Sequence, residues 1–488
     1  MRPEIIALAI IAIIVFGTIA FALTGVRRFK MNPQEYIVGS RSFGALLLWI
    51  LLAGEIYTSF TFLGAAGWAY GKGAPAFYIL AYGTIGYTIG YFYLPEVWRI
   101  GKERNLLTWG DLLADRYGSR ALGVAVGVLQ FFLTVPYVTL QLTGLQILLT
   151  IAGYGRYDAV AAVGAAFALI TLFVFTSGLR GAAWASVVKD ALVLAAVLFA
   201  GIVLPIHFFG SPAAMLDRVI ALHPDWMTLK TGTQQYGIVW YVSTVLLTSI
   251  GFFMGPANAQ SIYSAHDAKT VRRNMMLMPL YQLVIIFVFL AGFTALVVVP
   301  GLKGPAADQS FVLLLQRYYP AWVLGLVAGT GCLAALLPAS VLLLGAASIF
   351  SKNVLTDAFG VATSDRSRLF WTRALVLIVA SLSLVLWIFA RTSLVDLLLF
   401  YYNGVTQLFP GIIFALVWKR VSAWAVAAGL ITGEIIAAYS LHVSIGPWGI
   451  NPGFIALVAN VAVCCAVAFA FPRTATALAP SPYYRYRR

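Results

Sequence analysis

The chain has 488 residues, of which 61% are hydrophobic and only 10% are charged, and its mean hydropathy is +0.90. Soluble chains are about one-quarter charged, so this composition excludes a soluble globular protein and indicates a polytopic membrane protein. The formal net charge of +15 does not indicate nucleic-acid binding, because most basic residues fall in alternate connections between apolar stretches, where they set membrane topology.

The predicted elements are apolar stretches near the length of about 20 residues that a membrane-crossing helix requires. Alternate connections and the tail at 473–488 carry most of the basic residues, which places the N-terminus outside and the C-terminus inside the cell. We expect a multi-pass protein of the cytoplasmic membrane of a prokaryote, with about thirteen spans, at residues 4–24, 44–70, 74–95, 121–153, 157–177, 186–207, 236–264, 274–299, 321–351, 369–390, 395–418, 423–440 and 452–472.

Two of these spans contain helix-breaking and polar residues at their centres. The span 44–70 contains AGEIYTSFTFLGAAG, and the span 236–264 contains GFFMGPANAQS. Backbone groups freed at this depth persist only where they line a cavity or bind a solute. The two spans are five apart, and interrupted helices at matching positions of two halves mark the binding site of inverted-repeat transporters. The alternative is that Gly and Pro only kink two packed helices.

Several further motifs carry a family resemblance. The segment 408–433, LFPGIIFALVWKRVSAWAVAAGLITG, combines Phe-Pro, an apolar run, Trp-Lys-Arg and a Gly-x-x-x-Gly. This combination resembles the late signature of the sodium:solute symporter family, and the chain resembles that family over nearly its whole length. It is most similar to the monocarboxylate permease branch, which carries lactate, pyruvate and related short acids. The segments typical of that branch are TVPYVTLQLTG (134–144), SGLRGAAWASVVKD (177–190), AKTVRRN (268–274) and LLPASVLLLGAASIF (336–350).

The resemblance implies an all-α membrane protein with a five-plus-five inverted-repeat core, the LeuT-like fold. The expected organisation is an extra N-terminal helix with a basic loop at 1–43, a first repeat at 44–207, an external loop at 208–235, a second repeat at 236–418, two extra helices at 419–472 and a basic cytoplasmic tail at 473–488.

The resemblance also implies a sodium site, but this chain departs from the pattern. In sodium-coupled members, two adjacent hydroxyl side chains on the eighth core helix complete the ion site. That pair maps to Pro338 and Ala339, and Ser340 restores only one hydroxyl if the alignment shifts by one residue. Sodium needs several oxygens, so the site is incomplete. The family's carbonyl ligands map to Gly54, Tyr57 and Ala335.

Lys189 and Asp190 lie side by side at the head of the apolar run SVVKDALVLAAVLFAGIVL, residues 186–204. Charge is costly in the membrane and marks function by default. Family members carry an Asp at the position of Asp190, whereas Lys189 replaces a neutral residue. We hypothesise that the Lys189 ammonium takes the vacant sodium position and exchanges a proton during the cycle, with Asp190 tuning it. Alternatively, Lys189 extends to the cytoplasmic headgroups and Asp190 pairs with a loop arginine.

The candidates for substrate contact are polar side chains at the two breaks and on the fourth span. The hydroxyls of Thr58 and Thr61 can donate to a carboxylate beside the amide ends of half-helices, or can bond back to their own helix. Gln141 is a substrate contact by family position, or an ordinary helix–helix hydrogen bond. On the tenth core helix, Tyr402 and Gln407 are gate candidates. The substrate candidates are Tyr57, Thr58, Thr61, Tyr137, Gln141, Asn258 and Gln260.

These features predict a secondary active transporter and not an enzyme. It would take up a small monocarboxylate of the lactate, pyruvate and acetate class by alternating access, coupled to a proton in preference to sodium. The expected partners are the organic anion and the lipid bilayer, with no nucleic acid, no obligate protein partner, no cofactor and no metal. The alternatives are a sodium-coupled symporter of another solute, such as an amino acid or a vitamin, and a membrane-embedded sensor.

Overall fold

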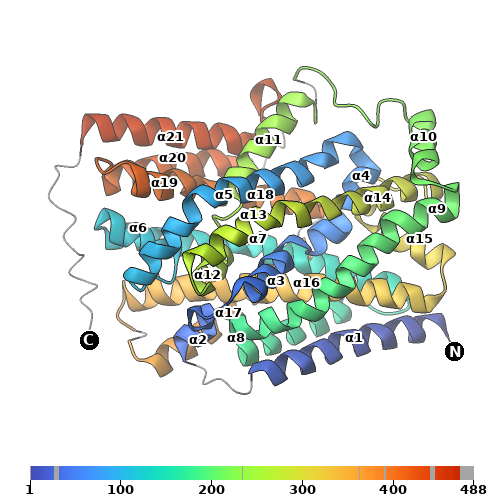
Figure 1. Cartoon of the computed structure of the whole chain (residues 1–488), viewed down its shortest axis with the longest axis horizontal. Coiled ribbons are helices and arrows are strands. Elements are labelled where there is room, and N and C mark those ends of the chain that lie inside the picture. Colours follow the sequence, from blue (N-terminus) through green and yellow to red (C-terminus); the bar gives the residue numbers. More distant parts are fainter. Residues whose placement is uncertain are drawn as a thin grey trace.

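The structure is a computed structural model, and it describes residues 2–26, 32–233, 235–361, 363–389, 392–439 and 446–472. The predicted tail at 473–488 lies outside the described residues. In the described ranges every regular element is a helix (Figure 1), and an isolated bridge joins Phe43 to Ala265. The predicted all-α class is confirmed.

The helices follow one another in the order of their labels in Figure 1. The first half contains α1 (Pro3–Val26), α2 (Pro33–Val38), α3 (Ala45–Ile56), α4 (Ala65–Lys72), α5 (Tyr78–Glu103), α6 (Trp109–Tyr117), α7 (Arg120–Ala152), α8 (Ala159–Leu198), α9 (Leu204–Phe209) and α10 (Pro212–Leu222). The second half contains α11 (Ile238–Gly251), α12 (Pro256–Ser264), α13 (Ala268–Gln282), α14 (Ile286–Val298), α15 (Ser310–Tyr318), α16 (Ala321–Ile349), α17 (Asp365–Phe389), α18 (Leu394–Val405), α19 (Phe409–Val417), α20 (Ala423–Tyr439) and α21 (Pro452–Ala470).

Short 3₁₀ or π segments join some of these helices. They are η1 (Gly39–Arg41), η2 (Phe60–Gly64), η3 (Ala74–Phe77), η4 (Phe199–Val203), η5 (Leu283–Ile285), η6 (Gly304–Gln309), η7 (Phe350–Thr356), η8 (Thr406–Leu408) and η9 (Pro447–Gly449).

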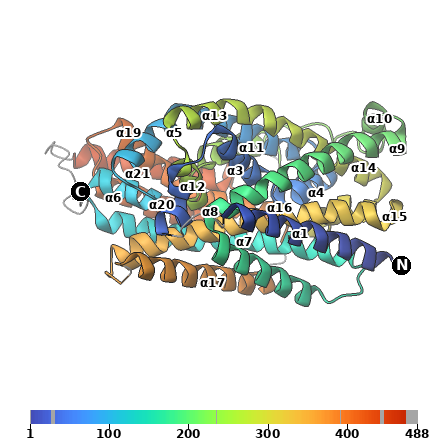
Figure 2. The ribbon, with the colours of Figure 1, turned by 60° about the horizontal axis from the view of Figure 1, so that its bottom comes forward.

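The long helices run roughly along the long axis of the molecule, as Figures 1 and 2 show. By length and hydropathy, 8 described helices can cross a membrane, or up to 10 if each of two bent pairs counts as one span. The start of α1 and the end of α21 lie at opposite ends of the long axis (Figure 1), as an odd number of spans requires. The full set of thirteen spans and the side on which each terminus lies stay predictions.

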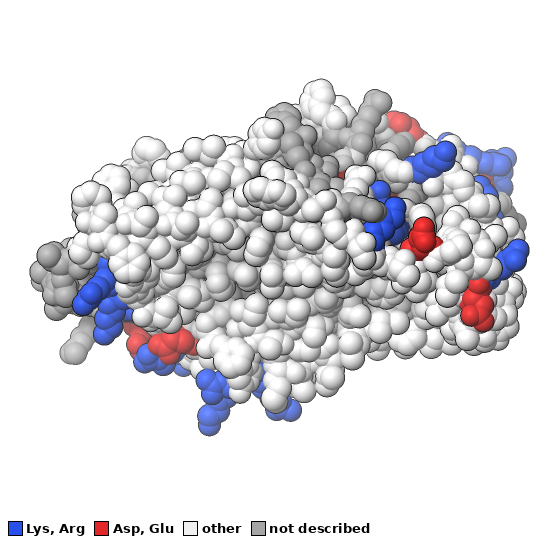
Figure 3. Space-filling view, turned by 90° about the horizontal axis from the view of Figure 1, so that it is seen from above, with Lys and Arg blue, Asp and Glu red and all other residues white. Residues whose placement is uncertain are grey.

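The surface is suited to a bilayer. On the face in Figure 3, most Lys, Arg, Asp and Glu lie at the right-hand end and along the lower left edge, and the broad area between them is almost entirely uncharged. Large apolar side chains point outwards, including Phe92, Phe389 and Trp424, which are 77%, 77% and 82% exposed. Lipid tails can cover such groups, whereas soluble proteins rarely expose large apolar patches to water.

Helix α16 lies at the centre of the bundle, and almost every residue from Val323 to Ile349 is buried. It packs against α1, α7 and α8. Helix α16 is apolar around its whole circumference and has no polar face to present to water. A helix of this kind is buried in the protein or in the membrane.

Helix α8 is interrupted at Gly178, where φ is 57° and ψ is −162°. A Cβ at this position would lie 2.8 Å from the ring of Tyr36, so both the backbone conformation and the close packing require glycine. The apolar segment Val160–Phe209 has 50 residues, about 75 Å at the rise of an α-helix. That is too long for one crossing of a bilayer, so the interruption divides it into two segments, close to the predicted boundary between 157–177 and 186–207.

Both predicted breaks are confirmed. Helix α3 and the segment Phe60–Lys72, which comprises η2 and α4, meet at an angle of 51° across residues 57–59. Helices α11 and α12 meet at 50° across the turn before Pro256. Proline at the first position of α12 suits a helix start, since its missing N–H would have no helical partner there. The two breaks place irregular backbone inside the bundle.

Candidate functional site

The side chain of Lys189 is completely buried and contacts the first break. Its Nζ donates to the carbonyl oxygen of Gly54 at 2.6 Å and to that of Tyr57 at 3.3 Å. Its ion-pair partner is Asp190, with Nζ 3.0 Å from Oδ1. Lys189 therefore lies inside the protein and does not extend to the lipid headgroups.

The local conformation explains why these carbonyls are available. In a continuous helix, the carbonyl of Gly54 would accept from the N–H of Thr58. Here α3 ends at Ile56, and the N–H of Thr58 is directed to the Ile56 carbonyl at 3.2 Å and to the Thr61 hydroxyl at 2.8 Å. A buried carbonyl without a partner is costly, and the Lys189 ammonium supplies that partner to Gly54.

The polar residues after Tyr57 hold the break in shape. The hydroxyl of Thr61 donates to the Ile56 carbonyl at 2.7 Å, and the hydroxyl of Thr58 accepts from the N–H of Phe60 at 3.1 Å. Both predicted substrate contacts are thus engaged with backbone of their own segment, the alternative weighed from the sequence.

Gln141 on α7 also supports the break. Its Oε1 accepts from the N–H of Ser59 at 3.2 Å and from the Ser59 hydroxyl at 2.6 Å. Its Nε2 is buried and has no hydrogen-bond partner within the described ranges. Gln141 therefore positions the broken segment and keeps one donor available.

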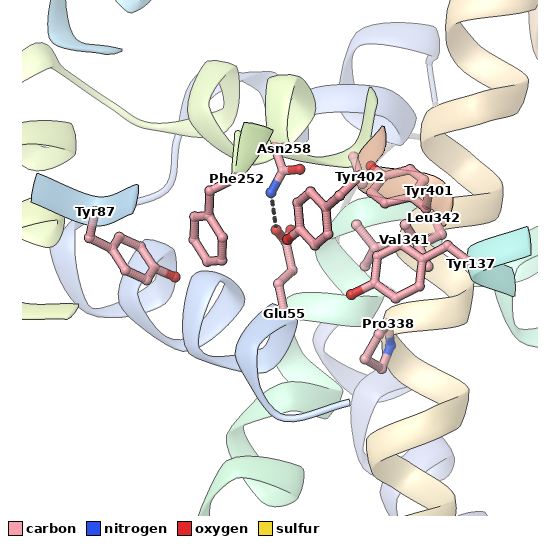
Figure 4. A pocket seen from close by; sticks show the side chains of 11 residues that line it. Glu55, Tyr87, Tyr137, Phe252, Asn258, Pro338, Val341, Leu342, Tyr401 and Tyr402 are labelled. Carbon is pink, nitrogen blue, oxygen red and sulfur yellow. Dashed lines mark hydrogen bonds between the residues drawn. The ribbon is translucent and has the colours of Figure 1, made fainter. Parts of the chain in front are cut away.

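A small cavity lies between the two breaks (Figure 4). It extends from the end of α3 to the start of α12 and is closed by α7, α16 and α18. Its volume is about 30 Å³, enough for one or two water molecules. A solute thus enters only if lining side chains move. The lining residues are Glu55, Tyr87, Tyr137, Phe252, Ala257, Asn258, Pro338, Val341, Leu342, Tyr401 and Tyr402.

Glu55 is the one charged residue in that lining set. One carboxylate oxygen accepts from Asn258 Nδ2 at 3.0 Å, drawn as the dashed line in Figure 4, and the other accepts from the Ser261 hydroxyl. Within the described part of the chain, no basic side chain lies within ion-pair distance of Glu55. The carboxylate at the end of α3 thus joins the first break to the second through α12.

Aromatic rings surround this carboxylate in a continuous chain. Ring centroids are 4.9 Å apart for Tyr87 and Phe252, 5.7 Å for Phe252 and Tyr82, 5.7 Å for Tyr82 and Tyr402, 5.4 Å for Tyr402 and Tyr401, and 4.9 Å for Tyr401 and Tyr137. All of these residues except Tyr82 line the cavity.

Of the predicted substrate contacts, Tyr137 and Asn258 line the cavity. Tyr57 presents its carbonyl to Lys189, while its ring packs on Tyr281 with centroids 5.2 Å apart. Gln260 is buried, and neither atom of its amide has a hydrogen-bond partner among the described residues. A direct role in substrate binding stays a prediction for each of them.

The remaining candidates lie on α16 and around α18. Ala335 is completely buried, and the Ser340 hydroxyl donates to the Leu337 carbonyl of its own helix at 2.6 Å. Tyr402 lines the cavity. Gln407 is not among the lining residues, and its Nε2 donates to the carbonyls of Asn403 and Gly453 at 2.9 and 3.2 Å. A gating role stays a prediction for both Tyr402 and Gln407.

The sequence analysis did not assign Glu55 or Tyr401. A signal for Glu55 was present, because an ionisable residue at an intramembrane break marks function by default. Its spacing to Asn258 and Ser261 was also visible, since residues three apart on α12 share one helix face. Nothing local in the sequence indicates that this face meets Glu55.

The residues at the family's ion position do not fit a sodium ion beside Lys189. Sodium is a hard cation that takes several oxygen ligands. The Lys189 ammonium is bonded to the carbonyls of Gly54 and Tyr57 and would repel a second cation there. Pro338 and Ala339 offer no side-chain oxygen. In the described residues no group of three or more His, Cys, Asp or Glu side chains could hold a metal ion.

Comparison with known proteins decides the family. The family model described as "Sodium:solute symporter family" matches residues 36–433. The chain belongs to this family.

Related proteins match over almost the whole length of this family member. The uncharacterized symporter YhjB of Bacillus subtilis is 38% identical over 93% of this chain and 96% of that protein. The monocarboxylate transport permease protein of Rhizobium johnstonii is 28% identical over 91% of each chain. The chain is similar to symporters, so it is a transporter and not an enzyme.

Solved structures show the same fold. A substrate-bound, outward-open Na⁺-coupled sialic acid symporter superposes with a TM-score of 0.82, at 15% identity, over 97% of this chain and 99% of that chain. Mhp1, a nucleobase-cation-symport-1 family transporter in a closed conformation, gives a TM-score of 0.57 at 15% identity. The protein therefore has the LeuT-like transporter fold, while its repeat boundaries stay predictions.

Proposed function

We propose that this sodium:solute symporter takes up a small solute by alternating access, coupled to a proton, with Lys189 in the position of the sodium ion. The observation that carries the proposal is the pair of bonds from the Lys189 ammonium to the carbonyls of Gly54 and Tyr57. A fixed cation there removes the need for a bound sodium ion and supplies a group that can gain and lose a proton.

The same bonds suggest how the proton is coupled to movement. The charged ammonium joins α8 to the end of α3 and is balanced by Asp190. A neutral amine bonds to carbonyls more weakly, because hydrogen bonds to charged groups are about twice as strong as neutral ones. Loss of the proton would thus loosen α8 from the first break and favour the conformation in which that break moves.

A short monocarboxylate is the proposed substrate class. The printed name of the Rhizobium relative supports a carboxylate. The first turn of α12 adds to this support, because it has no side-chain cap and its residues Ala257 and Asn258 line the cavity. N–H groups in the first turn of a helix lack helical partners and suit an anion.

Transport assays in proteoliposomes test this function. Counterflow of labelled lactate, pyruvate and other short acids should show exchange without any imposed gradient. An inward proton gradient in sodium-free buffer should then drive accumulation. Counterflow without proton-driven accumulation would overturn the coupling, and accumulation that requires external sodium would support sodium-coupled transport instead.

A further inference from the structure

A second cavity, with a volume of about 630 Å³, forms a groove at the edge of the bundle between α1 and the first part of α8. Figures 1 and 2 show α1 at this edge, and α8 packs against it. The buried side chains of Leu145 on α7 and Cys332 on α16 form the floor. The residues that line this groove and those that line the cavity between the breaks have no member in common.

The sequence explains why the groove is not filled by the protein itself. Helix α1 packs on α16 through one face, where a Cβ at Gly325 would lie 3.0 Å from Ala7. A neighbouring face of α1, with Leu8, Ala12 and Phe16 at intervals of four residues, lines the groove. The opposite wall, on α8, consists largely of alanines, whose methyl groups leave the space open. These are Ala161, Ala162, Ala165, Ala166 and Ala168.

The dimensions of the groove match a hydrocarbon chain of the bilayer. Its wall on α8 extends from Asp158 to Leu172, about 21 Å at the rise of an α-helix. Beyond that point the buried cluster of Ala22, Phe173 and Leu337 joins α1, α8 and α16. Half of the hydrocarbon core of a bilayer is about 15 Å thick, so the groove spans the depth of one leaflet. An apolar cavity does not hold water, whereas a lipid tail fits it.

The open end of the groove is polar and carries a basic side chain. Tyr157 and Asp158 line this end, and Arg156 precedes them. The Arg156 side chain is 58% exposed, and its Nη1 lies 2.7 Å from Glu4 Oε1. This ion pair uses one of the five N–H donors of the guanidinium. Arginine binds phosphate oxygens with short, strong hydrogen bonds, so Arg156 is suited to a phosphate at the mouth of the groove.

We propose that the groove is a binding site for a phospholipid of the bilayer, with one acyl chain between α1 and α8 and the phosphate on Arg156. Lipid tails are as apolar as the walls, so the chain alone does not select a phospholipid, and Arg156 supplies the selection. The bound lipid completes the packing of α1 on α8. This site is independent of the proposed transport function.

Lipid titration of the purified full-length protein tests the site. The protein is washed in detergent until phosphate analysis detects no phospholipid, and bound lipid is then counted by native mass spectrometry. The probes are dioleoyl phosphatidylglycerol and dioleoylglycerol, which have the same chains but differ by the phosphate. The wild-type protein should bind one phosphatidylglycerol per chain, about tenfold or more tightly than dioleoylglycerol, because hydrogen bonds to charged groups contribute on this scale.

Variants of the wall test the position of the chain. Ala165→Phe places a ring in the groove and should weaken phosphatidylglycerol binding about tenfold or more, since an added side chain that meets a bound group must displace it. Ala161→Leu, one turn earlier on the same wall, fills the same space with a smaller side chain and should act in the same direction. Ala438→Phe, at an exposed position of α20, is the matched control and should bind like the wild type.

Variants of the polar end test the phosphate contact. Arg156→Gln should reduce the affinity for phosphatidylglycerol to that for dioleoylglycerol, whereas Arg156→Lys keeps the charge and should retain part of the preference. Glu4→Gln breaks the same ion pair but leaves the guanidinium in place, so it should retain the preference. Melting temperatures measured without lipid show that each variant is folded.

The proposal is overturned if the two lipids bind equally well to the wild-type protein, if neither is retained, or if both wall variants bind phosphatidylglycerol like the wild type. It is also overturned if Glu4→Gln loses the preference as fully as Arg156→Gln does, since the ion pair and not the phosphate contact would then be the cause. If the wall variants convert a dimer to a monomer and lipid binding is unchanged, the groove holds a second copy of the chain instead.

Discussion

The Nζ atom of Lys189 lies 2.6 Å from the carbonyl oxygen of Gly54, on the last turn of a helix that ends inside the bundle. Two features of the sequence meet in this contact. The helix break frees the carbonyl, and the glycine lets the ammonium approach it. The contact connects α8 with the segment that also carries Glu55.

Replacement of Lys189 should uncouple transport. Lys189→Met and Lys189→Ala remove the group that exchanges the proton, so accumulation driven by a proton gradient should fall about tenfold or more, as for loss of a charged hydrogen bond. Counterflow, which needs no net proton movement, should persist in part. Lys269→Met is the matched control, because Lys269 is exposed. Full proton-driven accumulation by both Lys189 variants would remove this residue from the mechanism.

Gly54→Ala should displace the ammonium without changing any charge. A Cβ at Gly54 would lie 2.9 Å from the Ser186 hydroxyl and 3.2 Å from Lys189 Nζ. Overpacking of this kind costs about 1–3 kcal/mol, so we expect a lower melting temperature and weak proton-driven uptake. Gly164→Ala, where a Cβ meets nothing within 4 Å, should behave like the wild type. Equal behaviour of the two variants would show that the close approach at Gly54 has no role.

Thr61→Val should destabilise the first break. The hydroxyl accepts from the N–H of Thr58 and donates to the Ile56 carbonyl. Its loss removes two buried hydrogen bonds and leaves these backbone groups only the 3.2 Å bond to each other. The expected cost is about 1–3 kcal/mol, measured as a decrease in thermal stability. Thr176→Val is the control, because the exposed Thr176 bonds only to carbonyls of its own helix. A stable Thr61→Val protein would show that the break does not depend on this hydroxyl.

Asp308, in the η6 segment between α14 and α15, should make stability depend on pH. Burial raises the pKa of this carboxyl to about 7, the N–H of Leu394 lowers it in part, and the charge of Asp396 raises it further. An unfolded chain ionises near the usual value of about 3.9. The folded protein thus binds more protons between these values, and stability should be highest at acid pH and fall as the pH rises to about 7.

Thermal unfolding between pH 5 and 8 measures this effect, and the variant Asp308→Asn isolates it. The variant should lose the part of the pH dependence that Asp308 contributes, while the control Asp217→Asn should retain it. Parallel curves for Asp308→Asn and the wild type would contradict the assignment.

The sequence predicted the overall architecture well, for physical reasons. Apolar stretches of sufficient length predict membrane helices, and glycine, proline and polar residues inside two of them predict the breaks that α3–α4 and α11–α12 show. The hypothesis that Lys189 reaches the carbonyls near Gly54 came from the family resemblance, because nothing in the spacing of residues 54 and 189 indicates that they meet.

The aromatic chain and the position of Glu55 could not be predicted in the same way. Tyr87 and the pair Tyr401 and Tyr402 are on helices far apart in the sequence. A tyrosine that lines a cavity cannot be distinguished in a sequence from one that lies at the membrane–water interface. Which face of each helix points inwards depends on packing around α16. The same packing turns Gln407 towards Gly453 and Asn460, and so away from the lining of the cavity.

Solute uptake into sodium-free proteoliposomes under an inward proton gradient tests the central claim most directly. The account predicts accumulation that collapses when a protonophore is added and that Lys189→Met abolishes. Accumulation only in the presence of external sodium, unaffected by Lys189→Met, would contradict it.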